Sequence, residues 1–167
     1  VLKPSELTPN TSKIVEKIIK TVFEETLVVV IQGDAKVAQE LLKEQWDYIF
    51  FTGSVNVGKV VAQAAAQFLT PTTLELGGKN PCIIDETANI KLAAKRITWG
   101  KFFNGGQTCI APDYIIIHNS VKQPFIEALQ NEIEASYSSN PKESADFARI
   151  INSRNFLRLA KMLKYEN

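Results

Sequence analysis

Cysteine is the most reactive nucleophilic residue type in this sequence. Of the two cysteines, Cys109 has the surroundings that better suit a reactive thiol. It follows two glycines and two polar residues in "FFNGGQTCIAPDY", a segment able to adopt unusual backbone conformations and to expose a thiol. A thiolate there could act as a nucleophile. The alternative is a small buried hydrophobe, the commonest fate of a free cysteine. Cys82, in the apolar run "PCII", fits that alternative much better, and we assign it to the core.

A cysteine nucleophile needs a base, and the usual base is histidine. The only histidine, His118, ends the run "YIIIH" before two polar residues, a position typical of a surface turn, so a cysteine–histidine pair is disfavoured. The remaining candidate is Glu75 in "TLELGGK", at an apolar strand end where partial burial would make the carboxylate a better general base near neutral pH. The alternative is an edge-strand glutamate paired with a lysine such as Lys79.

Two further segments could bind a ligand. In "FFTGSVNVGK" an apolar run passes through Gly53 into a helix start, and such a turn points backbone N–H groups and the positive helix end at whatever lies above it, which suits a phosphate. The spacing of Gly53 and Gly58 matches neither the dinucleotide fingerprint nor a Walker A loop, so a plain tight turn is an equal alternative. Lys3 and Glu6, in "KPSE", follow a strand end and precede a helix, where charged residues are commonly solvated.

The composition is that of a globular protein and excludes several classes of partner. The 167 residues are 45% hydrophobic and 22% charged, enough for one domain or two part-domains. A net charge of +1 disfavours nucleic acid and anionic membranes as partners. The longest apolar runs are far shorter than the roughly 20 residues that span a bilayer, so we expect no membrane segment in this chain. Two cysteines form no dense disulfide framework, so we expect an intracellular protein, and no metal site is predicted.

Short apolar runs alternate with helix-sized amphipathic segments, which predicts an α/β fold with β-α-β units and parallel strands. The Gly77-Gly78 pair followed by Pro81 is the predicted boundary between two α/β halves. We expect strands at 27–31, 48–51, 82–84 and 114–117, and helices that start at Pro9, after Asp34, after Gly53, near Asn89 and near Val121. The predicted inward faces of the first and third helices consist of Ile14, Ile18, Ile19 and Val22, and of Val57, Val60, Val61, Ala64 and Ala65.

In their order and spacing, "VLKPSE", "FFTGSVNVGK", "LELGGKNP" and "NGGQTCIAPDY" together resemble the aldehyde dehydrogenase superfamily, over essentially the whole chain. The forms "GQTCIAPDY" and "DFARIINSRNFLRL" resemble its class 3 branch, which includes fatty aldehyde dehydrogenases. The resemblance implies that residues 1–78 are the C-terminal part of a Rossmann-like NAD(P)-binding domain. It also implies that residues 79–167 are the N-terminal part of the α/β catalytic domain that carries the thiol.

The same resemblance implies roles for individual residues. The Cys109 thiolate would attack the aldehyde carbonyl, hydride would leave the thiohemiacetal for the nicotinamide, and Glu75 would activate the water that hydrolyses the remaining thioester to a carboxylic acid. The Cys109 backbone N–H would donate to the oxyanion. The implied cofactor contacts are Lys3 and Glu6 to the adenosine ribose, Gly53 and Ser54 to the pyrophosphate, and Leu76 and Gly77 to the nicotinamide. The cofactor would be NAD or NADP, and Glu6 would disfavour a 2′-phosphate by like-charge repulsion.

Two functional residues of the family, an asparagine that completes the oxyanion site and a glutamate for the nicotinamide ribose, would lie before residue 1 and after residue 167. Because both residues would be missing, we expect little turnover from this polypeptide alone. The sequence begins in "VLKPSE" with what looks like the end of a strand and stops in "LAKMLKYEN" within or just after a helical pattern, so we interpret both termini as cuts. The family also implies an aldehyde substrate, a homo-oligomer such as a dimer, and a cytoplasmic location or membrane association through a C-terminal tail. The alternatives are an inactive truncated remnant or interaction module, and a thiol enzyme without nicotinamide, such as an acyltransferase, which the cofactor motifs disfavour.

Overall fold

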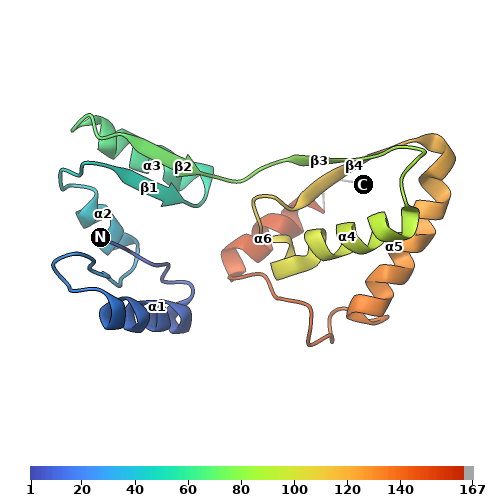
Figure 1. Cartoon of the computed structure of the whole chain (residues 1–167), viewed down its shortest axis with the longest axis horizontal. Coiled ribbons are helices and arrows are strands. Elements are labelled where there is room, and N and C mark those ends of the chain that lie inside the picture. Colours follow the sequence, from blue (N-terminus) through green and yellow to red (C-terminus); the bar gives the residue numbers. More distant parts are fainter. Residues whose placement is uncertain (164–167) are drawn as a thin grey trace. The chain divides into compact units, whose positions relative to one another are not determined.

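The structure is a computed structural model that describes residues 1–163, so the last four residues of the "LAKMLKYEN" segment lie outside the described part. The chain divides into two compact units, Val1–Leu76 and Gly77–Asn167 (Figure 1). The division falls immediately before the Gly77-Gly78 pair that predicted a boundary.

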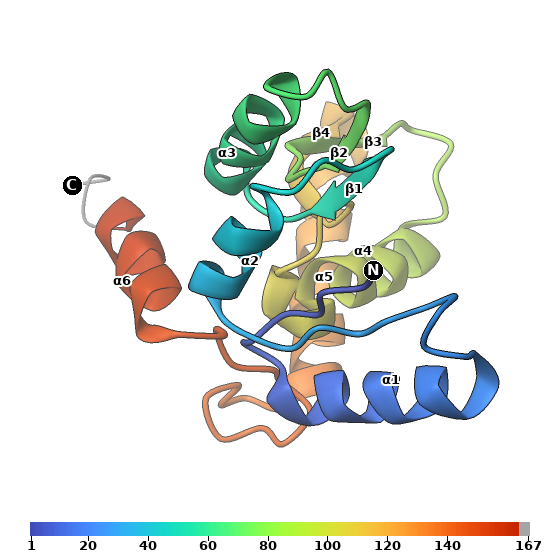
Figure 2. The same cartoon turned by 90° about the vertical axis from the view of Figure 1, so that its left-hand side faces the viewer.

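The centre of the first unit is a β-α-β element. Strand β1 (Ile49–Thr52) leads into helix α3 (Val55–Ala66), which returns to strand β2 (Thr72–Glu75). The strands pair in parallel with Ile49 opposite Thr72 and Thr52 opposite Glu75, as the alternation of apolar runs and helices predicted. Helix α3 lies along this strand pair in both views (Figures 1 and 2). Because the strands are parallel, their carboxyl ends meet at one edge, which brings the Gly53 turn next to Glu75.

Helices α1 (Pro9–Val22) and α2 (Ala35–Leu41) begin where the sequence predicts. The predicted strand at 27–31 is wrong, because only Val30 forms a bridge, to Leu2. The Leu2 N–H donates to the Val29 carbonyl at 2.8 Å and the Ile31 N–H to the Leu2 carbonyl at 2.9 Å. Pro4 has no N–H to donate, so the pairing of this short segment does not extend into a ladder.

The apolar faces of the first unit are only partly covered. On α3, Val61 and Ala65 are buried, whereas Val57 and Val60 remain about half exposed. The predicted inward face of α1 is wrong for this chain at three positions, with exposed fractions of 57% for Ile14, 55% for Ile18 and 66% for Val22. Helical spacing reveals that a face is apolar, but it does not reveal whether another element covers it.

The second unit contains another parallel β-α-β element followed by helices. Its elements are β3 (Asn80–Ile84), α4 (Ile90–Phe102), the 3₁₀ turn η1 (Phe103–Gly106), β4 (Pro112–Ile117), the 3₁₀ turn η2 (Asn119–Val121), α5 (Lys122–Tyr137) and α6 (Ser153–Met162). Strand β3 pairs in parallel with β4, and Cys82 lies opposite Ile115. The four predicted strands and helices of residues 79–137 are therefore confirmed within a few residues.

A buried cluster holds the second unit together. Ile84 of β3, Ala94 and Ile97 of α4 and Phe125 of α5 are each at most 8% exposed and pack on one another. Cys82 packs against this cluster, so its predicted place in the core is confirmed. Because α5 lies against α4, one face of the helix of the β-α-β element is covered by the chain that follows it.

Three negative observations apply to residues 1–163. No helix in this part of the chain has the length and apolar character needed to cross a membrane. The same residues contain no group of three or more His, Cys, Asp or Glu that could hold a metal ion. Both cysteines are free thiols.

Candidate functional site

The loop that carries Cys109 begins with a change of backbone handedness at the end of α4. Asn104, Gly105 and Gly106 have φ values of 53°, 63° and 75°, a left-handed region that favours glycine and asparagine. The unusual backbone predicted for this segment is thus confirmed. A turn follows, in which the Ala111 N–H donates to the Thr108 carbonyl at 3.1 Å. Cys109 is exposed within this turn, so burial as a small hydrophobe, the alternative for this residue, is wrong.

Gln107 joins the N-terminal side of this loop to residues 149–151 by hydrogen bonds. Its amide nitrogen donates to the Asn104 carbonyl at 2.8 Å and to the Arg149 carbonyl at 3.2 Å, and its amide oxygen accepts from the Ile151 N–H at 2.9 Å. Sequence reasoning did not single out Gln107, because two of its partners, Arg149 and Ile151, lie more than forty residues away. The only signal was its place two residues before the candidate nucleophile.

His118 lies at the other end of the strand from the Cys109 loop. Cys109 precedes β4, whereas His118 follows it, and six strand residues at about 3.3 Å each separate the two by roughly 20 Å. His118 is exposed, with Nδ1 2.8 Å from the Ser120 hydroxyl and Nε2 3.9 Å from the Glu86 carboxylate. The prediction of a surface turn residue is confirmed, and a pairing of His118 with Cys109 is excluded by this distance.

Glu75 is the last residue of β2, and its side chain is exposed. The partial burial that we expected for Glu75 is therefore wrong for this chain. Lys79, which was considered as an ion-pair partner, instead lies 3.3 Å from the Asp113 carboxylate. Glu75 belongs to the first unit and Cys109 to the second, so the surroundings of each are defined separately.

The predicted phosphate turn joins Glu75 at the carboxyl edge of β1 and β2. The Gly53 N–H donates to the Glu75 carbonyl at 2.9 Å. Ser54 is the N-cap of α3, and its hydroxyl accepts from the Val57 N–H at 3.3 Å. A helix of twelve residues presents unpaired N–H groups and the positive end of its dipole at this point, which is chemistry suited to a phosphate.

Leu76 packs directly onto α3. A Cβ at Gly58 would lie 2.8 Å from the Leu76 Cδ2, so a larger residue at position 58 would require the end of the Leu76 side chain to shift. A Cβ at Gly77 would meet nothing within 4 Å, so packing within the structure does not require glycine there. The first unit therefore brings together Gly53, Ser54, Glu75 and Leu76, four of the residues that the sequence selected.

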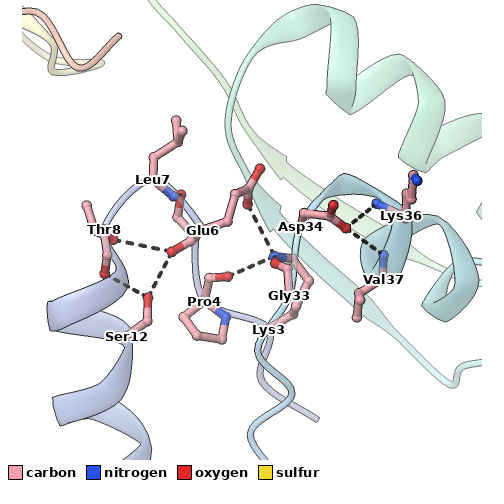
Figure 3. A network of polar contacts seen from close by, with 11 residues as sticks. Lys3, Pro4, Glu6, Leu7, Thr8, Ser12, Gly33, Asp34, Lys36 and Val37 are labelled. Carbon is pink, nitrogen blue, oxygen red and sulfur yellow. Dashed lines mark hydrogen bonds and ion pairs between the residues drawn. The ribbon is translucent and has the colours of Figure 1, made fainter.

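Lys3 and Glu6 also lie together, at the start of α2 (Figure 3). The Lys3 ammonium donates to the Pro4 carbonyl at 2.8 Å and the Gly33 carbonyl at 2.9 Å, and it lies 3.4 Å from the Glu6 carboxylate. The Lys3 side chain is only 19% exposed and the Glu6 side chain 43%. Lys3 is thus held by the chain rather than solvated, which contradicts the alternative proposed for it. Neither residue caps α1, whose N-cap position is Thr8.

Comparison with known proteins gives a consistent result over the whole chain. The profile described as "Aldehyde dehydrogenase family" matches residues 1–166. The 4,4′-diaponeurosporen-aldehyde dehydrogenase of Staphylococcus aureus is 49% identical over 163 residues, which are 98% of this chain and 36% of that protein. Aldehyde dehydrogenase family 3 member A2 of Macaca fascicularis is 48% identical over 164 residues, which are 98% of this chain and 34% of that protein.

A solved structure supports the same conclusion on the fold. The substrate-bound state of Staphylococcus aureus AldH superposes with a TM-score of 0.85 at 49% identity, covering 97% of this chain and 35% of that one. The predicted α/β class and the resemblance to the class 3 branch are confirmed. The chain spans about a third of the length of the relatives that it matches.

Proposed function

The chain belongs to the aldehyde dehydrogenase family, and from this premise we propose that it forms the thiol-bearing part of an enzyme that oxidises an aldehyde to a carboxylic acid with NAD or NADP. The observation that carries the proposal is the exposure of the free Cys109 thiol on a loop that two side-chain amides hold. The Gln107 amide before Cys109 accepts from the Ile151 N–H, and the Asn80 amide donates to the Cys109 carbonyl. A nucleophile must be both accessible and held in place, because orientation supplies much of the rate in such a reaction.

In the proposed reaction the Cys109 thiolate attacks the aldehyde carbon and forms a thiohemiacetal. The Cys109 backbone N–H donates to the developing oxyanion. Nicotinamide supplies the hydride acceptor when it is bound, and loss of hydride leaves a thioester on Cys109. The carboxylate of Glu75 removes a proton from water as the water oxygen attacks the thioester carbon. The C–S bond then breaks, which releases the carboxylic acid and restores the Cys109 thiolate.

The cofactor contacts are proposed from the chemistry of the first unit. The Lys3 ammonium and the Glu6 carboxylate, which lie 3.4 Å apart, would bind the hydroxyls of the adenosine ribose. The N-terminus of α3, with Gly53 and Ser54, fits a pyrophosphate because it combines unpaired N–H groups with a positive dipole end. A carboxylate at position 6 disfavours the 2′-phosphate of NADP, so we propose a preference for NAD.

Leu76 and Gly77 remain the proposed neighbours of the nicotinamide. Leu76 is held against α3, and the open space at Gly77 leaves room for a ring to approach the backbone. The proposed substrate is an apolar, long-chain aliphatic aldehyde. The relative named for 4,4′-diaponeurosporen-aldehyde supports this choice. Assembly as a homodimer and membrane association remain predictions from the family resemblance.

Thiol labelling tests the proposal in a polypeptide completed to the length of the relatives. The protein is treated with iodoacetamide, with and without an aliphatic aldehyde and NAD, and the labelled peptides are identified by mass spectrometry. We expect Cys109 to be labelled rapidly and to be protected when aldehyde and cofactor are both present. The partly buried Cys82 is the internal control and should label slowly in every sample. Labelling of Cys82 with Cys109 untouched would contradict the assignment.

A further inference from the structure

Asn80, the first residue of β3, contacts the backbone of the Cys109 loop directly. Its amide nitrogen donates to the Cys109 carbonyl at 2.6 Å and to the Ala111 carbonyl at 3.1 Å. Both neighbours are acceptors, so the NH₂ end of the amide must face them. The two carbonyls that flank residue 110 are thereby held by one side chain.

The backbone ladder is interrupted at this end of the sheet. Asn80 lies opposite Pro112, Pro81 lies opposite Tyr114, and the register shifts between Asn80 and Pro81. Pro81 and Pro112 have no N–H, so each strand lacks a donor where the Cys109 loop enters β4. At this interruption the side-chain amide of Asn80 is the group of β3 that donates to the Cys109 and Ala111 carbonyls.

Gly78 shows how closely this segment approaches the loop. A Cβ at position 78 would lie 2.8 Å from the Cys109 carbonyl oxygen and 3.1 Å from the Asn80 amide. The neighbour is backbone, which cannot move aside as the end of a flexible side chain would. The Cys109 carbonyl is therefore fixed between the backbone at Gly78 and the side chain of Asn80.

We propose that Asn80 is a positioning residue for Cys109, which fixes the peptide on the C-terminal side of the nucleophile while Gln107 fixes the N-terminal side. The positioning role of Asn80 rests on the proposed function of Cys109 as the nucleophile in aldehyde oxidation. With both flanks held, the thiol and the backbone N–H of Cys109 keep one orientation toward the aldehyde carbon. Misplacement of a reacting group by about 1 Å can lower a rate about 100-fold, so the loss of one flank has a measurable effect on turnover.

The test measures aldehyde oxidation by Asn80→Ala and Asn80→Ser in the polypeptide completed to the length of the relatives. Asn80→Ala removes both hydrogen bonds, and we expect kcat to fall about 10- to 100-fold while the KM for the cofactor changes by less than about twofold. Asn80→Ser retains a short donor near the Cys109 carbonyl and should recover part of the loss in kcat. A purely structural role would not produce this split between kcat and KM.

Asn89→Ala is the matched control for stability. The Asn89 side chain caps α4 by accepting from the Leu92 N–H at 3.0 Å, so its loss destabilises the same unit without a contact to the Cys109 loop. We expect Asn89→Ala to lower the unfolding temperature but to leave kcat within about twofold. If Asn80→Ala and Asn89→Ala had the same kcat, the positioning role of Asn80 would be refuted while the proposed function would stand. An unsubstituted protein without turnover would overturn the proposed function and the inference with it.

Discussion

Two β-α-β elements with the same parallel topology occur in this chain, and they differ in what covers their helices. In the second unit, α5 packs on one face of α4, where Ile84, Ala94, Ile97 and Phe125 form one buried cluster, while Leu92 and Trp99 on α4 remain 43% and 67% exposed. In the first unit, α3 buries Val61 and Ala65 but leaves Val57 and Val60 half exposed. A β-α-β element therefore specifies its own strand pairing, whereas the burial of its helix depends on which element packs next to it.

The candidate site residues follow the same division. The Cys109 loop is held by long-range side-chain hydrogen bonds from Asn80 and Gln107. The residues of the Gly53 turn are held by a local N-cap and by one hydrogen bond to Glu75 of the neighbouring strand. Side-chain amides therefore order the Cys109 loop, whereas the Gly53 turn depends on the helix N-cap and on strand pairing.

The largest expected effect separates the two thiols of the second unit. Cys109→Ser should lower aldehyde oxidation by about 1,000-fold or more, because a hydroxyl without a strong base is a far weaker nucleophile than a thiolate. Cys82→Ser should lower it by less than about tenfold, since this side chain only packs against the core. The measurement is the initial rate of cofactor reduction by the length-completed protein. Near-normal activity of Cys109→Ser would refute the assignment of the nucleophile.

The second prediction compares the cores of the two units by matched truncations. Phe125→Ala removes a ring that is 3% exposed and should cost about 3–5 kcal/mol of unfolding free energy. Ile18→Ala removes a side chain that is 55% exposed and should change the unfolding free energy by less than about 0.5 kcal/mol. Urea unfolding of the 167-residue chain, followed by circular dichroism, measures both. A large loss in Ile18→Ala would show that the α1 face is covered in solution.

The third prediction concerns the proposed cofactor side. Lys3→Met keeps the apolar stem but removes the ammonium that binds the Gly33 carbonyl, and it should weaken NAD binding about tenfold, because hydrogen bonds to charged groups contribute about 1.5–3 kcal/mol. Lys17→Met, at an exposed position of α1, is the matched control and should bind NAD normally. Quenching of Trp46 fluorescence by NAD measures both affinities. Equal NAD affinities of the two variants would show that Lys3 does not contribute to cofactor binding.

The smallest expected effect is a pH dependence at the end of β3. Hydrogen bonds from the Thr87 hydroxyl, at 2.8 Å, and then from the Thr87 N–H lower the pKa of Asp85 below its ordinary value of 3.8. The folded state therefore gains stability from Asp85 above the ordinary pKa and loses it as the pH falls through the lower folded pKa. We expect a slightly lower unfolding temperature for Asp85→Asn at pH 6 and no difference below about pH 2. A difference that persists in acid would have another cause.

The helices and strands could be predicted because their signals are local. Asp34 and Asn89 cap helices through bonds to residues two or three positions away, and the runs at 48–51 and 114–117 are apolar enough to be strands in any α/β arrangement. The run at 27–31 is similarly apolar, but it forms only the bridge between Val30 and Leu2, because the segment that pairs with it ends at Pro4. Strand propensity states what a segment can form, and a partner decides whether it does.

The sequence by itself determined the order of the elements, the presence of unusual backbone conformations before Cys109 and the residues that carry the family resemblance, since each of these depends on neighbouring residues. The tertiary structure alone decided that Glu75 is exposed, that Lys3 binds a carbonyl thirty residues away, and that Asn80 binds the carbonyl of Cys109. These contacts join segments that only folding brings together. The sequence does not show which carbonyl a side-chain amide will bind when the two lie far apart in the chain.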